Sequence, residues 1–204
     1  SFNTQQSFYQ KLKNFDYILL FCILLLGIIS TFSMYSTDGG EVLFHSKSHA
    51  TKFMIFFFMM IFLSFLSIRF YYFFSYILYI IILFFLIWAS FYGVKASGSQ
   101  RWISLYYVNL QPSELMKIAI IACLAKFYHR IQLDKVNSFP NILISMVILV
   151  LPTMLVISQP DLGTSILIIL SGLTIVWLAG LNIKYFLYSI FILLVSMPFV
   201  ISFL

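Results

Sequence analysis

Two short motifs of this chain each place an acid at the start of an apolar run. One is Gln111-Pro112-Ser113-Glu114 and the other is Gln159-Pro160-Asp161. Proline suits the first turn of a helix, where its missing N–H costs nothing, and a carboxylate there faces the positive end of the helix dipole. We therefore expect both motifs to open a helix on the same side of the chain's path. Lys117 follows Glu114 by three positions, so these two side chains share a helix face and can form an ion pair.

The segment 93–111, before the first motif, joins small flexible residues to a cation beside an aromatic ring. Trp102 suits a membrane interface, where the ring is buried and the indole N–H stays wet. Its neighbour Arg101, together with Lys95, is then expected to reach phosphate groups at head-group depth, because a guanidinium matches phosphate oxygens with two donors. The candidate substrate-binding residues are Lys95, Arg101, Gln111, Glu114, Lys117, Gln159 and Asp161.

Each of these patterns also has a purely structural interpretation. Glu114 and Lys117 would then be an intrahelical ion pair without a ligand. Arg101 and Trp102 would be an ordinary interfacial anchor. Asp161 would only cap the helix that it precedes. The residue types and spacings leave both interpretations open, and they assign no catalytic residue.

The composition requires that these residues be positioned by membrane helices. Of the 204 residues, 62% are hydrophobic and 9% are charged, whereas soluble domains have about 45–50% and about 25%. A helix needs roughly 20 apolar residues to cross a bilayer. The net charge of +6 is scattered between apolar runs, which argues against nucleic acid as a partner and favours contacts with membrane lipids. We predict an all-α integral membrane protein, a polytopic helix bundle.

Seven crossings are expected, and together they form a single transmembrane domain over residues 1–204. They are residues 17–35, 53–68, a third from about Phe70 or Ser75 to Tyr92, then 112–128, 140–158, 160–181 and 185–204, with Arg69 in a tight turn and 93–111 as an outer loop. Seven loop Lys and Arg residues fall on the side of the N-terminus and four on the other side, so the N-terminus is expected in the cytoplasm. His45 and His49 have the spacing of helical metal ligands, but a polar loop is expected there, without a third ligand, so no metal site is predicted.

Ionised residues inside the bilayer are expected to gather round a polar cavity. On insertion scales an ionised residue at the centre of a membrane helix costs about 2.5–3.5 kcal/mol. Glu114, Lys117 and Asp161 should therefore avoid lipid. We expect a cavity among the fourth, fifth and sixth crossings that opens to the outer face of the membrane.

Three stretches of the chain carry a family resemblance. Gly98–Ile103, Gln111–Lys117 and Gln159–Ser165 resemble the signature of the RodA/FtsW family, also called the SEDS family for shape, elongation, division and sporulation. The order, the spacing and the placement between helices match along essentially the whole chain. The stretch that begins at Gln159 favours the rod-shape branch of the family over the division branch.

The resemblance implies a ten-helix peptidoglycan glycosyltransferase. Such a polymerase joins lipid II units into glycan strands at the outer face of the bacterial inner membrane during cell elongation, and its usual partner is a class B penicillin-binding protein. By the motif match, Glu114 and Lys117 correspond to the family's buried pair in the central cavity. Arg101 corresponds to its outer-loop arginine and Asp161 to the acid that opens the sixth helix. A divalent cation at the lipid diphosphate is compatible with this chemistry, and no other cofactor is expected.

One part of the family pattern does not occur in the sequence. The family's catalytic aspartate lies in an outer loop after the seventh helix, within a His-Thr-Asp-Phe pattern, and the sequence ends at Leu204 before such a loop. The resemblance therefore covers seven of ten helices, and we expect a fragment, a truncated product or a split gene. Two alternative functions stay open: a lipid II flippase, which needs a cavity reached from both sides, and an inactive scaffold for a transpeptidase.

Overall fold

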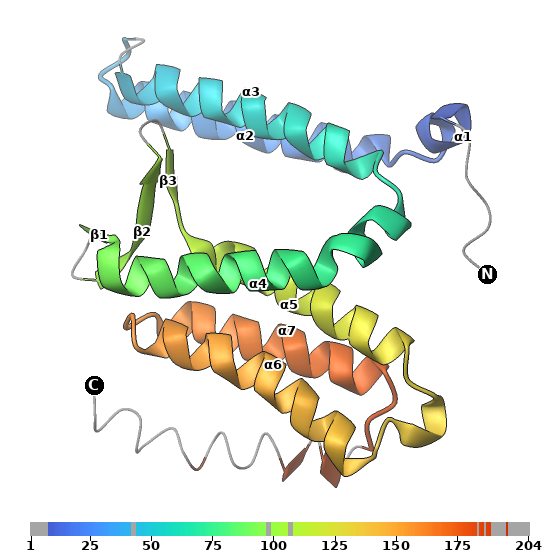
Figure 1. Cartoon of the computed structure of the whole chain (residues 1–204). Coiled ribbons are helices and arrows are strands. Elements are labelled where there is room, and N and C mark those ends of the chain that lie inside the picture. Colours follow the sequence, from blue (N-terminus) through green and yellow to red (C-terminus); the bar gives the residue numbers. More distant parts are fainter. Residues whose placement is uncertain are drawn as a thin grey trace. The chain divides into compact units, whose positions relative to one another are not determined.

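The computed structural model describes residues 8–41, 44–96, 99–105, 108–182 and the positions 184, 185, 187, 188 and 195. Its internal contacts divide the chain into two compact units, Ser1–Phe70 and Tyr71–Leu204. The helices in chain order are α1 Phe8–Lys13, α2 Tyr17–Thr37, α3 Phe44–Ser64, α4 Ile68–Tyr92, α5 Pro112–His129, α6 Phe139–Ile157 and α7 Leu162–Leu178, with a short 3-10 helix at Leu133–Lys135 between α5 and α6 (Figure 1).

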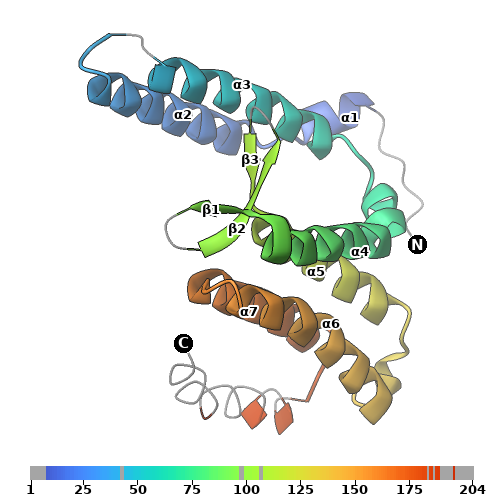
Figure 2. The same cartoon turned by 60° about the vertical axis from the view of Figure 1, so that its left-hand side comes forward.

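The first unit is a hairpin of α2 and α3, which lie side by side in Figures 1 and 2. Asp16 caps α2, because its carboxylate accepts the N–H of Leu19 at 2.9 Å. Gly27 of α2 lets α3 approach closely: a Cβ at this position would collide with the ring of Phe53. Small residues at helix contacts serve the same purpose in membrane bundles generally.

Helix α3 begins nine residues before the expected start at Phe53, so the expected polar loop is in part helical. The physical reason is a capping contact from the end of α2. Asp38 lies just after α2, and its carboxylate accepts the backbone N–H of Ser46 at 2.8 Å. That bond satisfies one of the free donors of the first turn, which allows the turns containing His45 and Lys47 to be helical although they are polar.

Helix α4 also begins earlier than expected. Residues 65–67 separate α3 from α4, and Arg69, which was expected in the turn, lies in the first turn of α4. Ser67 fixes this start, because both its carbonyl and its hydroxyl oxygen accept the N–H of Phe70, at 2.9 and 3.4 Å.

The second unit has its core where α5 and α7 pack against each other and against α6. The largest fully buried side chains there include Leu86, Met116, Ile120, Leu124 and Ile168. Gly172 permits the close approach of α6 and α7, since a Cβ there would collide with Leu149. Tyr79 ties α4 to α6, because its hydroxyl donates to the carbonyl of Ile148 at 2.9 Å.

The segment between α4 and α5 contains a small antiparallel sheet, which the sequence analysis did not predict. Its strands are β1 Val94–Ala96, β2 Ser99–Leu105 and β3 Val108–Leu110, with β2 in the middle (Figure 2). Val94 pairs with Trp102, and Ile103 pairs with Leu110. A Cβ at Gly93 would collide with the carbonyl of Ala89, so a residue without a side chain is needed where the sheet leaves α4. The strands hold Arg101 at a fixed place on β2.

Three helices, α2, α4 and α6, are long and apolar enough to cross a membrane, and α7 is an apolar helix of 17 residues. Helices α3 and α5 have similar lengths but carry charged side chains. The described residues thus contain six long helices rather than the expected seven. Of the expected seventh crossing, 185–204, nearly all lies outside the described residues.

Candidate functional site

Asp161 brings together three segments of the second unit that are far apart in the sequence. Arg101 comes from β2, Gln111 is the N-cap of α5, and Asp161 is the N-cap of α7. We call these three residues the Asp161 cluster. It lies where both helices begin, at the same end of this unit (Figure 1).

The carboxylate of Asp161 forms one ion pair and accepts two hydrogen bonds. Its Oδ2 atom lies 3.2 Å from Nη1 of Arg101 and accepts a hydrogen bond from Nε2 of Gln111 at 3.0 Å. Its Oδ1 atom accepts the backbone N–H of Thr164 at 3.2 Å. The side chain of Asp161 is 11% exposed and that of Arg101 is 25% exposed. At a largely buried site, an ion pair with further hydrogen bonds holds its side chains in fixed positions.

This geometry confirms that the two motifs begin helices at the same end, but it corrects one detail. Pro112 is the first residue of α5, as expected. Pro160, in contrast, lies in a turn, and α7 begins at Leu162. Asp161 is therefore the N-cap of α7 and not a first-turn residue. The reason is that its own side chain accepts the Thr164 N–H, which is the N-cap arrangement.

Three buried polar atoms, one in the cluster and two at positions two residues from a cluster residue in the sequence, have no hydrogen-bond partner in the part of the chain that the structure describes. They are Nε of Arg101, Oγ of Ser113 and Oε1 of Gln159. Ser113 is 1% exposed and Gln159 is 4% exposed. A buried donor or acceptor without a hydrogen-bond partner costs about 1–3 kcal/mol. Each of these atoms is therefore a candidate contact for a polar ligand or an ordered water.

The electrostatics of this place suit an anion. The N-termini of α5 and α7 meet there, and each carries a partial positive charge and free backbone N–H groups. Arg101 adds a full positive charge, and its guanidinium contacts the Asp161 carboxylate through Nη1. The unpartnered Nε of Arg101 is a donor for a further oxygen.

Gln159 has a second, structural contact. Its Nε2 donates to the carbonyl of Leu86 at 3.2 Å and to Oγ of Ser90 at 2.6 Å. Both acceptors belong to α4, so this glutamine holds the turn before α7 against α4. Its carbonyl oxygen is the atom that stays available for a ligand.

Glu114 and Lys117 form the expected ion pair, with Nζ and Oε2 separated by 2.9 Å. The pair is more open than expected, because 53% of the Glu114 side chain is exposed. Among the described residues, no hydrogen bond or ion pair joins it to the Asp161 cluster. One cavity lies between α2 and α3 in the first unit, and the polar cavity expected among α5, α6 and α7 stays a prediction.

The remaining candidates from the sequence lie elsewhere. Lys95 is in β1 opposite Gln100, and its side chain is outside the described part. His45 and His49 lie in the first turns of α3, not in a loop. His49 is 3.4 Å from the hydroxyl of Thr31 on α2, measured from its Nδ1.

Lys126 lies inside α5 and is only 6% exposed. Its ammonium donates to the carbonyl of Phe73 at 3.0 Å and lies 5.0 and 4.4 Å from the ring centres of Tyr72 and Tyr76. Arg130, just after α5, donates to the hydroxyl of Tyr72 at 3.1 Å, and this bond raises the pKa of Arg130. The sequence feature that could have predicted a buried cation here is the pair Tyr72 and Tyr76, which are four residues apart on α4 and share a helix face.

Comparisons with known proteins agree with this architecture. The FtsW/RodA/SpoVE family, described as cell cycle proteins, matches residues 10–204. The chain is 30% identical over 194 residues to a probable peptidoglycan glycosyltransferase FtsW of Buchnera aphidicola, covering 91% of this chain and 51% of that relative. It is 45% identical over 91 residues to the peptidoglycan glycosyltransferase MrdB of Escherichia coli K12, covering 45% of this chain and 24% of MrdB.

A solved structure supports the same fold. A chain from a peptidoglycan synthase complex superposes with a TM-score of 0.77 at 22% identity, covering 91% of this chain and 54% of that one. The chain thus spans about half the length of the FtsW relative and of the solved structure. Because the family match extends over nearly the whole chain, this polytopic all-α membrane protein belongs to the FtsW/RodA/SpoVE family of cell cycle proteins.

Proposed function

We propose that the intact protein is a peptidoglycan glycosyltransferase of the bacterial inner membrane. It polymerises lipid II into glycan strands at the outer face during cell elongation. Support comes from the names of the relatives FtsW and MrdB and from the Asp161 cluster. A class B penicillin-binding protein is the proposed partner, since the superposed chain belongs to a complex that coordinates polymerization and crosslinking.

The single observation that carries the proposal is Nε of Arg101, which has no hydrogen-bond partner among the described residues and belongs to a cluster at two helix N-termini. Polymerisation of lipid II releases a lipid diphosphate, so the site must stabilise negative charge that grows as the sugar bond breaks. A guanidinium held by Asp161 through Nη1 has its remaining donors fixed in direction. In our proposal these donors and the N–H groups of the first turns bind the diphosphate.

The other charged residues have supporting functions in this proposal. Asp161 positions Arg101 and caps α7. Lys117 supplies a second cation when a phosphate oxygen replaces or shares its bond to Glu114. The hydroxyl of Ser113 and the amide oxygen of Gln159 bind polar groups of the same ligand, either directly or through water.

The topology belongs to the same proposal. With the N-terminus in the cytoplasm, α2 ends at the outer face, and alternation of crossings brings the starts of α5 and α7 to the outer face as well. Labelling of single cysteines with a membrane-impermeant reagent in intact spheroplasts tests this orientation. Cysteines at Asn109 and Ser158 should react from outside and one at Asp134 should not; the reverse pattern refutes the orientation.

The proposed activity is tested by polymerisation of purified lipid II by the intact protein together with its transpeptidase. Arg101→Gln should lower kcat/KM at least tenfold, whereas Arg130→Gln, which removes a charge from the opposite end of α5, should leave it unchanged. Equal activity of Arg101→Gln and the unmodified protein would refute the assignment of Arg101. Movement of lipid II across vesicle membranes without any polymerisation would replace the proposal by a flippase.

A further inference from the structure

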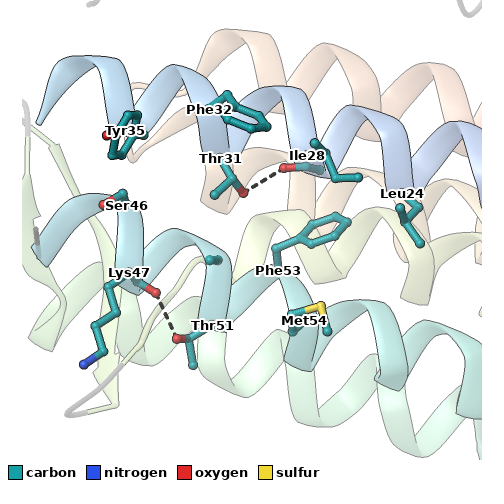
Figure 3. Close-up of a pocket in the computed structure, with 12 residues that line it drawn as sticks. Leu24, Ile28, Thr31, Phe32, Tyr35, Ser46, Lys47, Thr51, Phe53 and Met54 are labelled. Atoms are coloured by element: carbon teal, nitrogen blue, oxygen red, sulfur yellow. Dashed lines mark hydrogen bonds between the residues drawn. The ribbon is translucent and has the colours of Figure 1, made fainter. Parts of the chain in front are cut away.

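The hairpin of α2 and α3 forms a groove of about 750 Å³, which is within the range of small-molecule sites. Figure 3 shows its side chains. The walls of the groove are mostly apolar, and they include Leu24, Ile28 and Phe32 from α2 and Phe53 and Met54 from α3. The Asp161 cluster belongs to the other unit, so the groove is a separate feature of the chain.

The groove is polar at one end only. Tyr35, Ser46 and Lys47 lie at this end in Figure 3, and Leu24 lies at the opposite end. The hydroxyl groups of Thr31 and Thr51 do not compete for a ligand, because each donates to a carbonyl of its own helix, those of Gly27 and Lys47. The groove therefore has a charged head and an apolar body.

The charge at the polar end is available to an anion. Lys47 is exposed and pairs with no carboxylate among the residues that the structure describes. The nearby carboxylate of Asp38 is occupied, because it accepts the N–H of Ser46 at 2.8 Å. An ammonium group at the end of an apolar groove on a membrane helix has the arrangement that a phosphate above an acyl chain requires.

We propose that this groove holds one anionic phospholipid, with its phosphate beside Lys47 and an acyl chain along Ile28 and Phe53. The distance from Lys47 to Met54 along α3 is about 10 Å at 1.5 Å per residue, so the groove takes the upper part of a chain. The lipid fills the gap between the two helices and joins them at the head-group level.

The walls of the groove favour a lipid over a partner helix. Helices pack in membranes through small residues that let the backbones approach. The one glycine of the groove, Gly27, is already covered by the ring of Phe53. The other walls are long side chains such as Phe32 and Met54, between which a flexible acyl chain fits and a helix backbone does not.

Native mass spectrometry of the intact protein with added palmitoyl-oleoyl phosphatidylglycerol tests the proposal. Lys47→Gln should weaken binding about fivefold, because one Lys near an anionic head group contributes about 1 kcal/mol. Lys52→Gln removes the same charge from the same helix outside the groove and should have no effect. Ile28→Trp should fill the groove and abolish the bound lipid, whereas Ile29→Trp, at the next and more exposed position outside the groove lining, should not. Each variant's melting temperature is measured beside it to exclude unfolding.

Four results would overturn the proposal. The first is equal loss of lipid from Lys47→Gln and Lys52→Gln. The second is retention of phosphatidylglycerol by a folded Ile28→Trp variant. The third is equal binding of zwitterionic phosphatidylethanolamine, which would mean that the head group is not recognised. A mass corresponding to a dimer in place of a lipid adduct would assign the groove to a second copy of the chain and reject the lipid.

Discussion

Replacing Asp161 should show how much of the second unit's stability depends on the ion pair and the two hydrogen bonds that its carboxylate forms. In Asp161→Ala the N-cap of α7 is lost, which costs about 1 kcal/mol. The largely buried Arg101 also loses its counter-charge. Removing one partner of a buried ion pair costs about 3–5 kcal/mol, and we reduce this to about 2 kcal/mol because a quarter of the Arg101 side chain is exposed. We expect a total loss of about 3 kcal/mol.

Thermal unfolding of the detergent-purified protein, followed by the loss of the monodisperse peak in size-exclusion chromatography, measures this loss. For a protein of this size 1 kcal/mol corresponds to about 2–4 °C, so the melting temperature should fall by about 6–12 °C. Asp161→Asn keeps the cap and one acceptor, and it should lose about half as much. Asp134→Ala, which removes an exposed acid outside the cluster, is the matched control and should be neutral.

A double-mutant cycle with Arg101→Gln separates the ion pair from the cap. Because each single variant leaves a buried charge without its partner, Arg101→Gln with Asp161→Asn should be more stable than the sum of the single effects predicts, by at least about 1 kcal/mol. Two results would refute the reasoning: additive effects in the cycle, or a melting temperature of Asp161→Ala equal to that of Asp134→Ala.

Three further perturbations follow from the packing and from one titrating group. Lys126→Met should change stability by less than about 1 kcal/mol, because an apolar chain of similar size fills the same space. Lys126→Glu should unfold the region, because it directs an acid at the Phe73 carbonyl; melting temperatures in the opposite order would contradict this. Gly172→Ala should lower the free energy of unfolding by about 1–3 kcal/mol, because the new Cβ collides with Leu149. Gly163→Ala, whose Cβ meets nothing within 4 Å, should be neutral. Equal melting temperatures of these two variants would be inconsistent with the α6–α7 contact. The Ser46 N–H lowers the pKa of Asp38 below its ordinary 3.8, so this contact stabilises α3 fully above pH 3.8 and is lost as the pH falls through the lower pKa of the folded protein. Circular dichroism, with each protein compared with its own spectrum at neutral pH, should show a greater loss of helix in acid for the unmodified protein than for Asp38→Asn. Identical titrations of the two proteins would exclude the contact.

Contacts within one helix could be predicted from the sequence. The pairing of Glu114 with Lys117 follows from a spacing of three residues, and the start of α5 follows from Pro112. The start of α3 could not be predicted, because it depends on Asp38, which lies beyond the end of another helix. Hydropathy alone places the boundary where apolar residues begin, and a capped polar turn extends the helix beyond it.

Contacts between distant segments were beyond sequence reasoning. Arg101 and Asp161 were both identified as candidates, but nothing in their spacing of sixty residues indicates that they touch. The sheet that positions Arg101 gave no usable signal, because β1 and β3, the neighbours of β2, have three residues each, too few positions to show alternation. The burial of Lys126 could not be predicted from the sequence, because buried lysines are rare. Its burial depends on a carbonyl and two rings that α4 supplies.

Binding of undecaprenyl diphosphate is the most direct test of the central claim that the Asp161 cluster with its two helix N-termini is a diphosphate site. Isothermal titration of the detergent-purified protein compares the unmodified form, Arg101→Gln and the control Arg130→Gln. We predict a Kd at least tenfold weaker for Arg101→Gln alone, with a binding enthalpy that falls as salt is added. A Kd that is the same in all three proteins would contradict the account.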